Sequence, residues 1–206
     1  MTGAFALAIV LAAAATGNHA AISGDTDPSG IYLTTMGDLS VLVGERCLAF
    51  SYLSVFGPTA HIYDGAGIAR EEEAGRFVWA DEHGSVAFVF HGDALRLEVE
   101  GIASFCGAGW PGDTVSIAAR HAPSRRVVAV DQAHFHTVGS ETPVSRRAYV
   151  VRGDTVEVVP TRHGNGEGFV LARFVGPART TVGLLREHEL APEPAPKLPP
   201  IATEAQ

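Results

Sequence analysis

The sequence is poor in lysine and lacks the short motifs that mark common enzyme classes. Its single lysine, Lys197, lies near the C-terminus, which excludes a catalytic lysine in a folded core. The patterns G-x-S-x-G, G-x-x-x-x-G-K-[ST] and H-E-x-x-H, typical of esterases, nucleotide-binding enzymes and zinc proteases, do not occur. We therefore expect a non-catalytic protein without a cofactor. A hydrolase that assembles acidic and histidine side chains from distant positions is the alternative.

Long apolar segments are also missing. The longest one covers residues 4–15, whereas a helix needs about 20 apolar residues to span a bilayer. This run has the length of a signal-peptide core, and the small residues after it place cleavage at Ala15, Gly17 or Ala21. No lysine or arginine precedes it, so a buried N-terminal strand or helix is the alternative. We expect residues 1–21 to be removed on export, leaving a periplasmic or secreted chain without a stable membrane span.

Only two cysteines occur, Cys47 and Cys106. In an exported protein an even number of cysteines usually forms bridges, and this bridge would close a loop of about 60 residues, worth about 4 kcal/mol. The segment SFCGAGWPGD around Cys106 is close in composition to the nucleophile segment of papain-like proteases. In those enzymes the cysteine directly precedes the aromatic residue, a place that Gly109 takes here. We predict a structural Cys47–Cys106 disulfide, with two unpaired buried thiols as the alternative and a catalytic thiol disfavoured.

Acidic residues exceed basic ones, and the excess is unevenly distributed along the chain. The net charge is −8; residues 21–120 hold 14 acidic side chains against 5 arginines, whereas residues 121–190 hold 7 against 9. Two domains with different surfaces are the simplest interpretation. An acidic domain is unsuited to nucleic acid and favours a basic protein partner, although the same charge can simply serve solubility.

Short segments rich in β-branched and aromatic residues, separated by glycine, proline and aspartate, dominate the first half of the chain. In the clearest of them Leu95, Leu97 and Val99 alternate with charged residues, as a half-buried strand requires. The charged segment IAREEEAG, residues 68–75, is expected to form a loop. The pattern predicts an antiparallel β-barrel or sandwich over residues 22–120, with strands near residues 30–35, 39–43, 47–55, 61–69, 76–80, 85–91 and 94–100.

This order of segments resembles the lysozyme-inhibitor-like β-barrel domains of exported bacterial proteins. The matching residues are an opening Gly-x-Tyr at Gly30 and Tyr32, the segment HIYDGAGIA at residues 61–69, and a closing CGAG that begins at Cys106. Tyr63 stands where the family has a cysteine, and the inhibitory Ser-Gly-x-x-Tyr loop of some members has no counterpart. The resemblance implies a small barrel that binds another protein, with lysozyme as the partner that the family suggests.

The segments RRAYVVRGDTVEVV, GEGFVLARFVG and TTVGLLREHEL, within residues 146–190, resemble a bacterial SH3-like domain. Gly153 and Asp154 mark a turn between two of its strands. The resemblance implies a second small barrel with a groove for cell-wall material or a Pro-rich peptide. Its three aromatic side chains could instead fill the barrel core. The groove residues that it implies are Tyr149, Phe169, Phe174 and Leu184, the last in the place of the family's tryptophan.

Residues 121–145 are expected to form a connector with one strand, over residues 127–136. His134 and His136 lie two positions apart, so a strand would place them on one face, either as a pair of metal ligands or as exposed polar residues. The sequence places no third ligand beside them, and we assign no metal. Residues 191–206 are Pro-rich and are expected to form an extended or disordered tail.

These patterns predict an all-β, exported and non-catalytic binding protein of the bacterial cell envelope. Its acidic N-terminal barrel or sandwich would engage a basic protein such as lysozyme. Alternatively, the small C-terminal SH3-like barrel would act as an adaptor that binds cell wall or peptide. Neither nucleic acid nor a cofactor is expected as a ligand.

Overall fold

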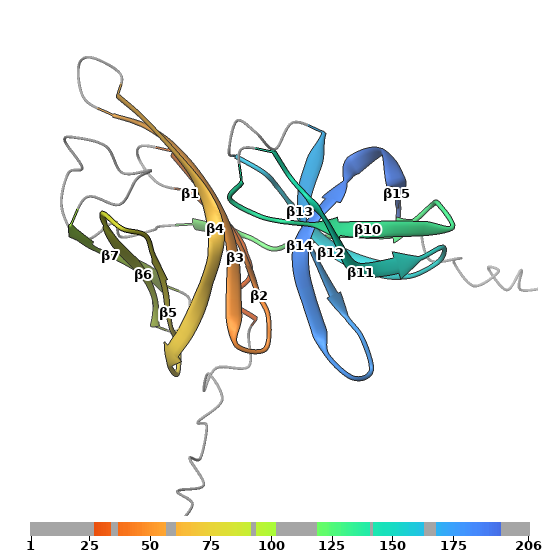
Figure 1. Cartoon of the computed structure of the whole chain (residues 1–206), viewed down its shortest axis with the longest axis horizontal. Helices are drawn as coiled ribbons and strands as arrows, with labels where there is room; N and C mark the ends of the chain where they lie inside the picture. Colours follow the sequence, from red (N-terminus) through yellow and green to blue (C-terminus); the bar gives the residue numbers. More distant parts are fainter. Residues whose placement is uncertain are drawn as a thin grey trace, which may run out of the picture.

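The structure is a computed structural model of the chain, and it describes residues 27–33, 37–56, 61–91, 94–101, 119–140, 142–162 and 168–194. Strands and turns make up this part of the chain, apart from one short 3-10 helix. Two antiparallel sheets lie side by side (Figure 1), so the predicted all-β class is confirmed. No helix in these ranges is both long and apolar enough to cross a bilayer. The expected signal peptide, residues 1–21, lies outside the described residues.

The first sheet is a meander in which most strands pair with the next strand along the chain. Its eight strands follow the order β7-β6-β5-β4-β3-β2-β1-β8. They lie close to the positions that the alternating pattern predicts, because each short apolar segment is bounded by turn-forming residues. The strands are β1 (Gly30–Leu33), β2 (Gly37–Val43), β3 (Cys47–Phe56), β4 (His61–Glu73), β5 (Arg76–Ala80), β6 (Gly84–His91), β7 (Ala94–Gly101) and β8 (Ala119–His121).

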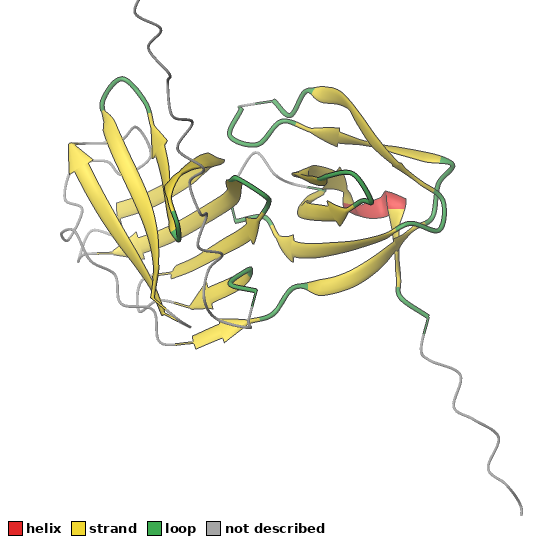
Figure 2. Ribbon diagram, turned by 90° about the horizontal axis from the view of Figure 1, so that it is seen from below, coloured by secondary structure: helices red, strands yellow, loops and turns green. Residues whose placement is uncertain are grey.

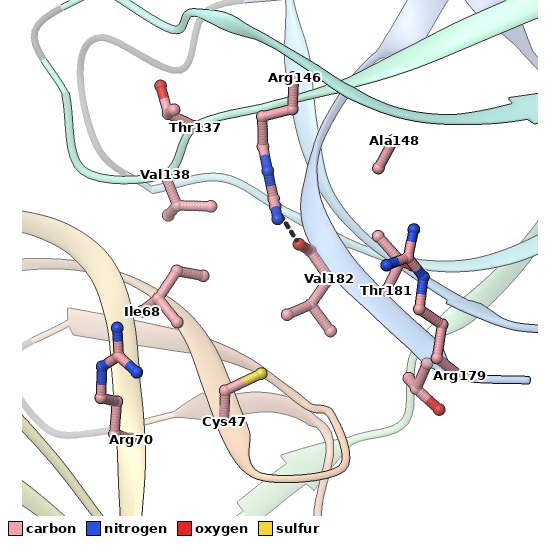
Figure 3. A pocket seen from close by; sticks show the side chains of 11 residues that line it. Cys47, Ile68, Arg70, Thr137, Val138, Arg146, Ala148, Arg179, Thr181 and Val182 are labelled. Atoms are coloured by element: carbon pink, nitrogen blue, oxygen red, sulfur yellow. Dashed lines mark hydrogen bonds between the residues drawn. The ribbon is translucent and has the colours of Figure 1, made fainter.

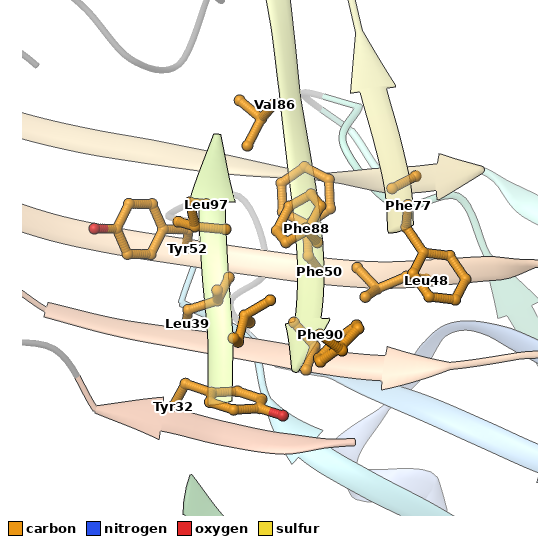
Figure 4. Close-up of a cluster of buried hydrophobic side chains, with 13 residues drawn as sticks. Tyr32, Leu39, Leu48, Phe50, Tyr52, Phe77, Val86, Phe88, Phe90 and Leu97 are labelled. Atoms are coloured by element: carbon orange, nitrogen blue, oxygen red, sulfur yellow. The ribbon is translucent and has the colours of Figure 1, made fainter. Parts of the chain in front are cut away.

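Aromatic side chains form the core of the first sheet, which curls so that β5, β6 and β7 lie over β1, β2 and β3 (Figure 4). Phe50 on β3 and Phe88 on β6 meet across this core with their ring centroids 4.8 Å apart. Trp79 packs edge-on against Phe50 and covers Gly67. A Cβ atom at position 67 would lie 2.6 Å from the indole nitrogen, so glycine provides the space for this ring.

The expectation of a charged loop at residues 68–75 is wrong, because β4 continues through this segment as far as Glu73. β4 pairs there with β5 across a register shift, and Gly75 makes the turn with a φ of +78°. Glu72 and Glu73 stay exposed, Glu73 pairs with Arg76, and Glu72 lies in the register shift. A run of charged residues on an exposed strand has the same composition as a charged loop. Composition therefore could not distinguish the two structures for this segment.

The second sheet has seven strands in the order β11-β10-β14-β13-β12-β9-β15. β12, β13 and β14 form a meander, and the chain returns through the 3-10 helix η2 so that β15 pairs with β9. Val128, Phe135 and Leu185 are among the buried side chains of its core. The elements are β9 (Ser124–Val128), β10 (Gln132–His136), β11 (Ser145–Val151), β12 (Thr155–Pro160), β13 (Phe169–Val175), β14 (Thr180–Arg186), η2 (Glu187–Glu189) and β15 (Leu190–Pro192).

The range 121–145, expected as a connector with one strand, contributes two strands to this sheet. Backbone hydrogen bonds from Ala129 to Glu189 and from Arg152 to Asp131 hold the turn that separates β9 from β10. β9 pairs with β12, and β10 pairs with β11. These partners lie downstream in the chain, so only the tertiary structure reveals that this range belongs to the sheet.

The two sheets lie side by side (Figure 2), and an apolar layer of side chains joins them. Because of this layer, the β12–β14 meander is buried on both faces. The layer contains Leu42, Ala49, Val159, Leu171, Val182 and Leu184. Beside it, the loop between β10 and β11 touches β4 at Gly139, whose φ is +82°. A Cβ atom at Gly139 would lie 2.3 Å from the carbonyl oxygen of Ala66, so the close contact between the sheets requires glycine at this position.

Arg173 on β13 is buried in the layer, at 8% exposure, and binds groups from both sheets. Its Nε donates to Glu157 Oε2 at 2.6 Å, and its Nη1 donates to Ser29 Oγ at 2.9 Å and to the Val43 carbonyl at 2.8 Å. Its Nη2 contacts the carboxylates of Asp27 and Glu157. We call Arg173 with these four partners the Arg173 cluster. All three guanidinium nitrogens are engaged, so the buried charge is compensated.

Replacing Arg173 should weaken the whole molecule. Arg173→Met leaves Asp27 and Glu157 without their cation, and we expect the free energy of unfolding to fall by about 2–4 kcal/mol. Urea denaturation followed by circular dichroism measures this change. Arg152→Met is the matched control, because Arg152 pairs with Asp131 at an exposed site and should cost less than about 1 kcal/mol. Equal losses in the two variants would contradict the importance of the Arg173 cluster.

The Arg173 cluster should also make stability depend on pH. Burial raises the pKa of Asp27, but hydrogen bonds from Arg173 and from the Ser29 N–H outweigh this effect and lower the pKa below its ordinary value. The stabilisation is therefore present above the pKa of unfolded aspartate, about 3.9, and is lost as the pH falls through the lower pKa of the folded state.

Asp27→Asn should flatten the dependence of unfolding free energy on pH in that acidic range. Urea denaturation at a series of pH values below about 5 measures the slope. Asp131→Asn, at the exposed pair with Arg152, is the control and should leave the slope as in the parent. A slope that Asp27→Asn leaves unchanged would show that Asp27 is not held in its charged form.

Candidate functional site

An open cleft of about 400 Å³ lies at one end of the junction between the two sheets (Figure 3). We call it the arginine cleft. Each sheet provides part of its lining, and the first sheet provides Cys47 from the start of β3 and both Ile68 and Arg70 from β4. The second sheet provides the rest, from the β10–β11 loop, β11, the β13–β14 turn and β14: Thr137, Val138, Arg146, Ala148, Arg179, Thr180, Thr181 and Val182.

Three guanidinium groups surround this space. In Figure 3, Arg70 and Arg179 lie on opposite sides, and Arg146 extends between them from β11. Arg146 Nη1 donates to the carbonyl oxygen of Val182 at 2.9 Å, which fixes its side chain across the cleft. Among the described residues, none of the three arginines forms an ion pair with a carboxylate. The cleft is therefore a local concentration of positive charge.

The carboxylate of Glu45 lies beside the cleft, next to the lining residue Thr180, and already has a donor. The backbone N–H of Thr180 donates to Glu45 Oε1 at 3.0 Å. Another charged hollow, over β5, β6 and β7, differs because Glu98 contacts both Arg76 and Arg96. Its charges neutralise one another, which leaves the arginine cleft as the better ligand site.

Cys47 lies beside these arginines as a free thiol. Burial raises the pKa of Cys47, while the positive charges of Arg146 and Arg70 act in the opposite direction and do not overcome it. Its expected bridge partner, Cys106, lies outside the described residues, so the disulfide stays a prediction. In the thiol form Cys47 contributes a small, weakly polar surface to the cleft.

The four residues implied as an SH3-like groove lie in three different environments. Leu184, 5% exposed, and Phe169 belong to the apolar layer between the sheets. Phe174 packs against the core of the second sheet, whereas Tyr149 is 53% exposed on β11 and contacts His134. The structure does not bring the four together, because the first sheet covers the surface where Leu184 and Phe169 lie.

The two histidines of β10 also differ in environment. The ring Nδ1 of His134 lies 3.1 Å from the Arg146 carbonyl oxygen at an exposed position. His136 is 6% exposed and packs edge-on against Phe169, and its Nδ1 has no hydrogen-bond partner among the residues described. The pairing between β10 and β11 shifts register between the two histidines. In the described part of the chain, no three or more histidine, cysteine, aspartate or glutamate residues gather as a metal site.

Sequence reasoning did not find the arginine cleft. Its three arginines come from β4, β11 and the β13–β14 turn, and no local spacing connects them. The only sequence signal was the excess of basic over acidic residues in residues 121–190. Arg70 carries no such signal, since it precedes a run of three glutamates in the acidic half.

No family model, curated protein or solved structure matches this chain. The resemblances to lysozyme-inhibitor-like and SH3-like domains therefore rest on the residues quoted for them. The function must be argued from the arginine cleft and its surroundings.

The thiol of Cys47 should react slowly at neutral pH. Because burial raises its pKa, its reaction with iodoacetamide should reach half its maximal rate at a higher pH in the folded chain than in the same chain unfolded in urea. Mass spectrometry of the Cys47 peptide, after reduction of the sample, measures this midpoint. A folded midpoint at or below the unfolded one would show that the arginines dominate the thiol.

Proposed function

We propose that the chain is an exported, non-catalytic binding protein of the bacterial cell envelope, and that the arginine cleft is its ligand site. One observation carries the proposal: an open cleft, lined by both sheets, gathers three arginines that have no carboxylate partner in the described part of the chain. Ligand sites are commonly found where two structural units meet, at volumes of about 300–1,000 Å³. The apolar run over residues 4–15 supports export.

The form of the second sheet supports an adaptor role of the SH3-like kind. It is small and curled, and its last strand, β15, returns through η2 to pair with its first strand, β9. This return of the chain to β9 is compatible with a small SH3-like fold. The first sheet covers Leu184 and Phe169, two of the residues of the groove implied for such a domain. We therefore assign the ligand surface to the neighbouring arginine cleft.

The rigid attachment of the two sheets supports a binding role for the cleft. The Arg173 cluster and the Gly139 contact fix β4 relative to the second sheet, and Arg146 is held by Val182 before any ligand arrives. Groups that are already in position lose little conformational entropy on binding.

A second candidate function uses the outer surface of the first sheet. Glu72, Glu82 and Glu100 are exposed there, and the acidic half has only five arginines. Such a surface favours a basic protein, for which lysozyme is the example that the family resemblance suggests.

Cosedimentation with isolated peptidoglycan tests the first proposal. The full chain should sediment with the cell wall, and Thr181→Trp should reduce the bound fraction because the indole fills the arginine cleft. Ser145→Trp, at an exposed position outside the cleft lining, should bind as the parent does.

Modification of Cys47 with N-ethylmaleimide, after reduction of the sample, provides a second block that does not depend on the folding of Thr181→Trp. It should reduce cell-wall binding of the parent, whereas Cys47→Ser treated in the same way should keep it. Unchanged binding after both blocks would reject the cleft as the site. Lysozyme binding that Glu72→Gln/Glu100→Gln abolishes, with no binding to the cell wall, would favour the second candidate.

A further inference from the structure

We infer that the arginine cleft binds a ligand that carries at least two oxyanion groups, carboxylate or phosphate. This inference rests on the proposed function in so far as the cleft is the ligand site, and it adds the chemical class of the ligand.

The guanidinium groups come from three separate elements and two different sheets. Arg70 extends from β4 and Arg179 from the β13–β14 turn, on opposite sides of the cleft, with Arg146 between them (Figure 3). Three positive charges around one open space repel one another, and a nearby anion lowers their electrostatic energy. Because no carboxylate of the described chain does this for any of the three, an external anion is the natural counter-charge.

The three side chains retain the donors that an oxyanion needs. A guanidinium has five N–H donors in a planar fork, which matches the paired oxygens of carboxylate and phosphate. Within the described ranges, the three side chains make one hydrogen bond, from Arg146 to the Val182 carbonyl, and it leaves other N–H groups of Arg146 available. Hydroxyl groups of Thr137 and Thr181 also line the cleft, although Thr137 Oγ1 already contacts Ser140 and Val144.

The size of the cleft favours a ligand with more than one anionic group. A single small anion fills little of about 400 Å³ and reaches only one side, whereas a ligand with two separated groups reaches Arg70 and Arg179 together. The chain as a whole is acidic, at −8, so a long polyanion such as nucleic acid would be repelled beyond the cleft. A compact ligand that fits within the positive region is therefore preferred.

Calorimetric titration of the full chain with citrate, pyrophosphate and acetate at low salt tests the inference. Citrate or pyrophosphate should bind, and acetate should bind at least about tenfold more weakly. Binding of citrate alone identifies a carboxylate ligand, and binding of pyrophosphate alone identifies a phosphate ligand. Raising the salt from about 20 mM to about 200 mM should weaken the binding, because the arginines are exposed. Binding of neither compound would overturn the inference.

Arg70→Gln/Arg179→Gln should weaken the binding of citrate or pyrophosphate at least about tenfold, because it removes the guanidinium groups on both sides of the cleft. Both side chains are exposed and form no ion pair with any residue that the structure describes, so the variant should fold. Arg147→Gln is the control: Arg147 follows Arg146 on β11 and points to the other face, where it does not line the cleft. An equal loss in the control would show that only net charge matters.

Cys47 offers a measurement that needs no ligand. Iodoacetate and iodoacetamide are similar in size and differ in charge, so the ratio of their rates at Cys47 reports the local potential. After reduction, this ratio should be several-fold higher in the parent than in Arg70→Gln/Arg179→Gln, and Arg147→Gln should match the parent. Equal ratios in all three would contradict a positive cleft.

The outcomes separate this inference from the proposed function. Cell-wall binding that Thr181→Trp blocks, together with no effect of Arg70→Gln/Arg179→Gln, would keep the cleft as the ligand site and reject an anionic ligand. Citrate or pyrophosphate binding without cell-wall binding would keep the anion site and reject the envelope role.

Discussion

The arrangement of the two sheets depends on one buried cation, Arg173. A guanidinium removed from water is costly unless its N–H groups find acceptors, and here those acceptors come from both sheets. Ser29 and Val43 belong to the first sheet and the segment before it, whereas Glu157 lies on β12 of the second. The apolar layer around them holds the sheets together, but hydrophobic contacts are non-directional and do not fix how one sheet lies on the other. The Arg173 cluster fixes their relative position, because a shift of one sheet along the other would leave the cation without acceptors.

This fixed arrangement creates the arginine cleft as a consequence. Once the sheets dock, β4 lies beside the β10–β11 loop, and the contact of Gly139 with Ala66 sets how closely they approach. Arg70 then lies across from Arg179, although the two are separated by more than half of the described chain. The same docking covers Phe169 and Leu184, which explains why residues implied as an exposed groove are buried instead.

The charge pattern acquires a different meaning in the folded molecule. By sequence the first half is acidic and the second is mildly basic, which suggests two surfaces and two partners. In the structure, one arginine of the acidic half joins two arginines of the basic half around a single space. A locally positive cleft in a negative molecule selects compact anions and repels extended ones. The distribution of charge in space, rather than along the chain, carries the functional argument.

The all-β class and most strand positions follow from the sequence alone. Alternating apolar and polar residues and turn-forming residues are local signals that do not depend on a distant part of the chain. Where charge replaced alternation, at residues 68–75, the same reasoning missed a strand. It also missed that residues 121–145 complete the second sheet, since strand pairing joins distant segments. The Arg173 cluster and the arginine cleft could be found only from the tertiary structure. Both depend on contacts between the sheets, and no local pattern encodes which faces meet.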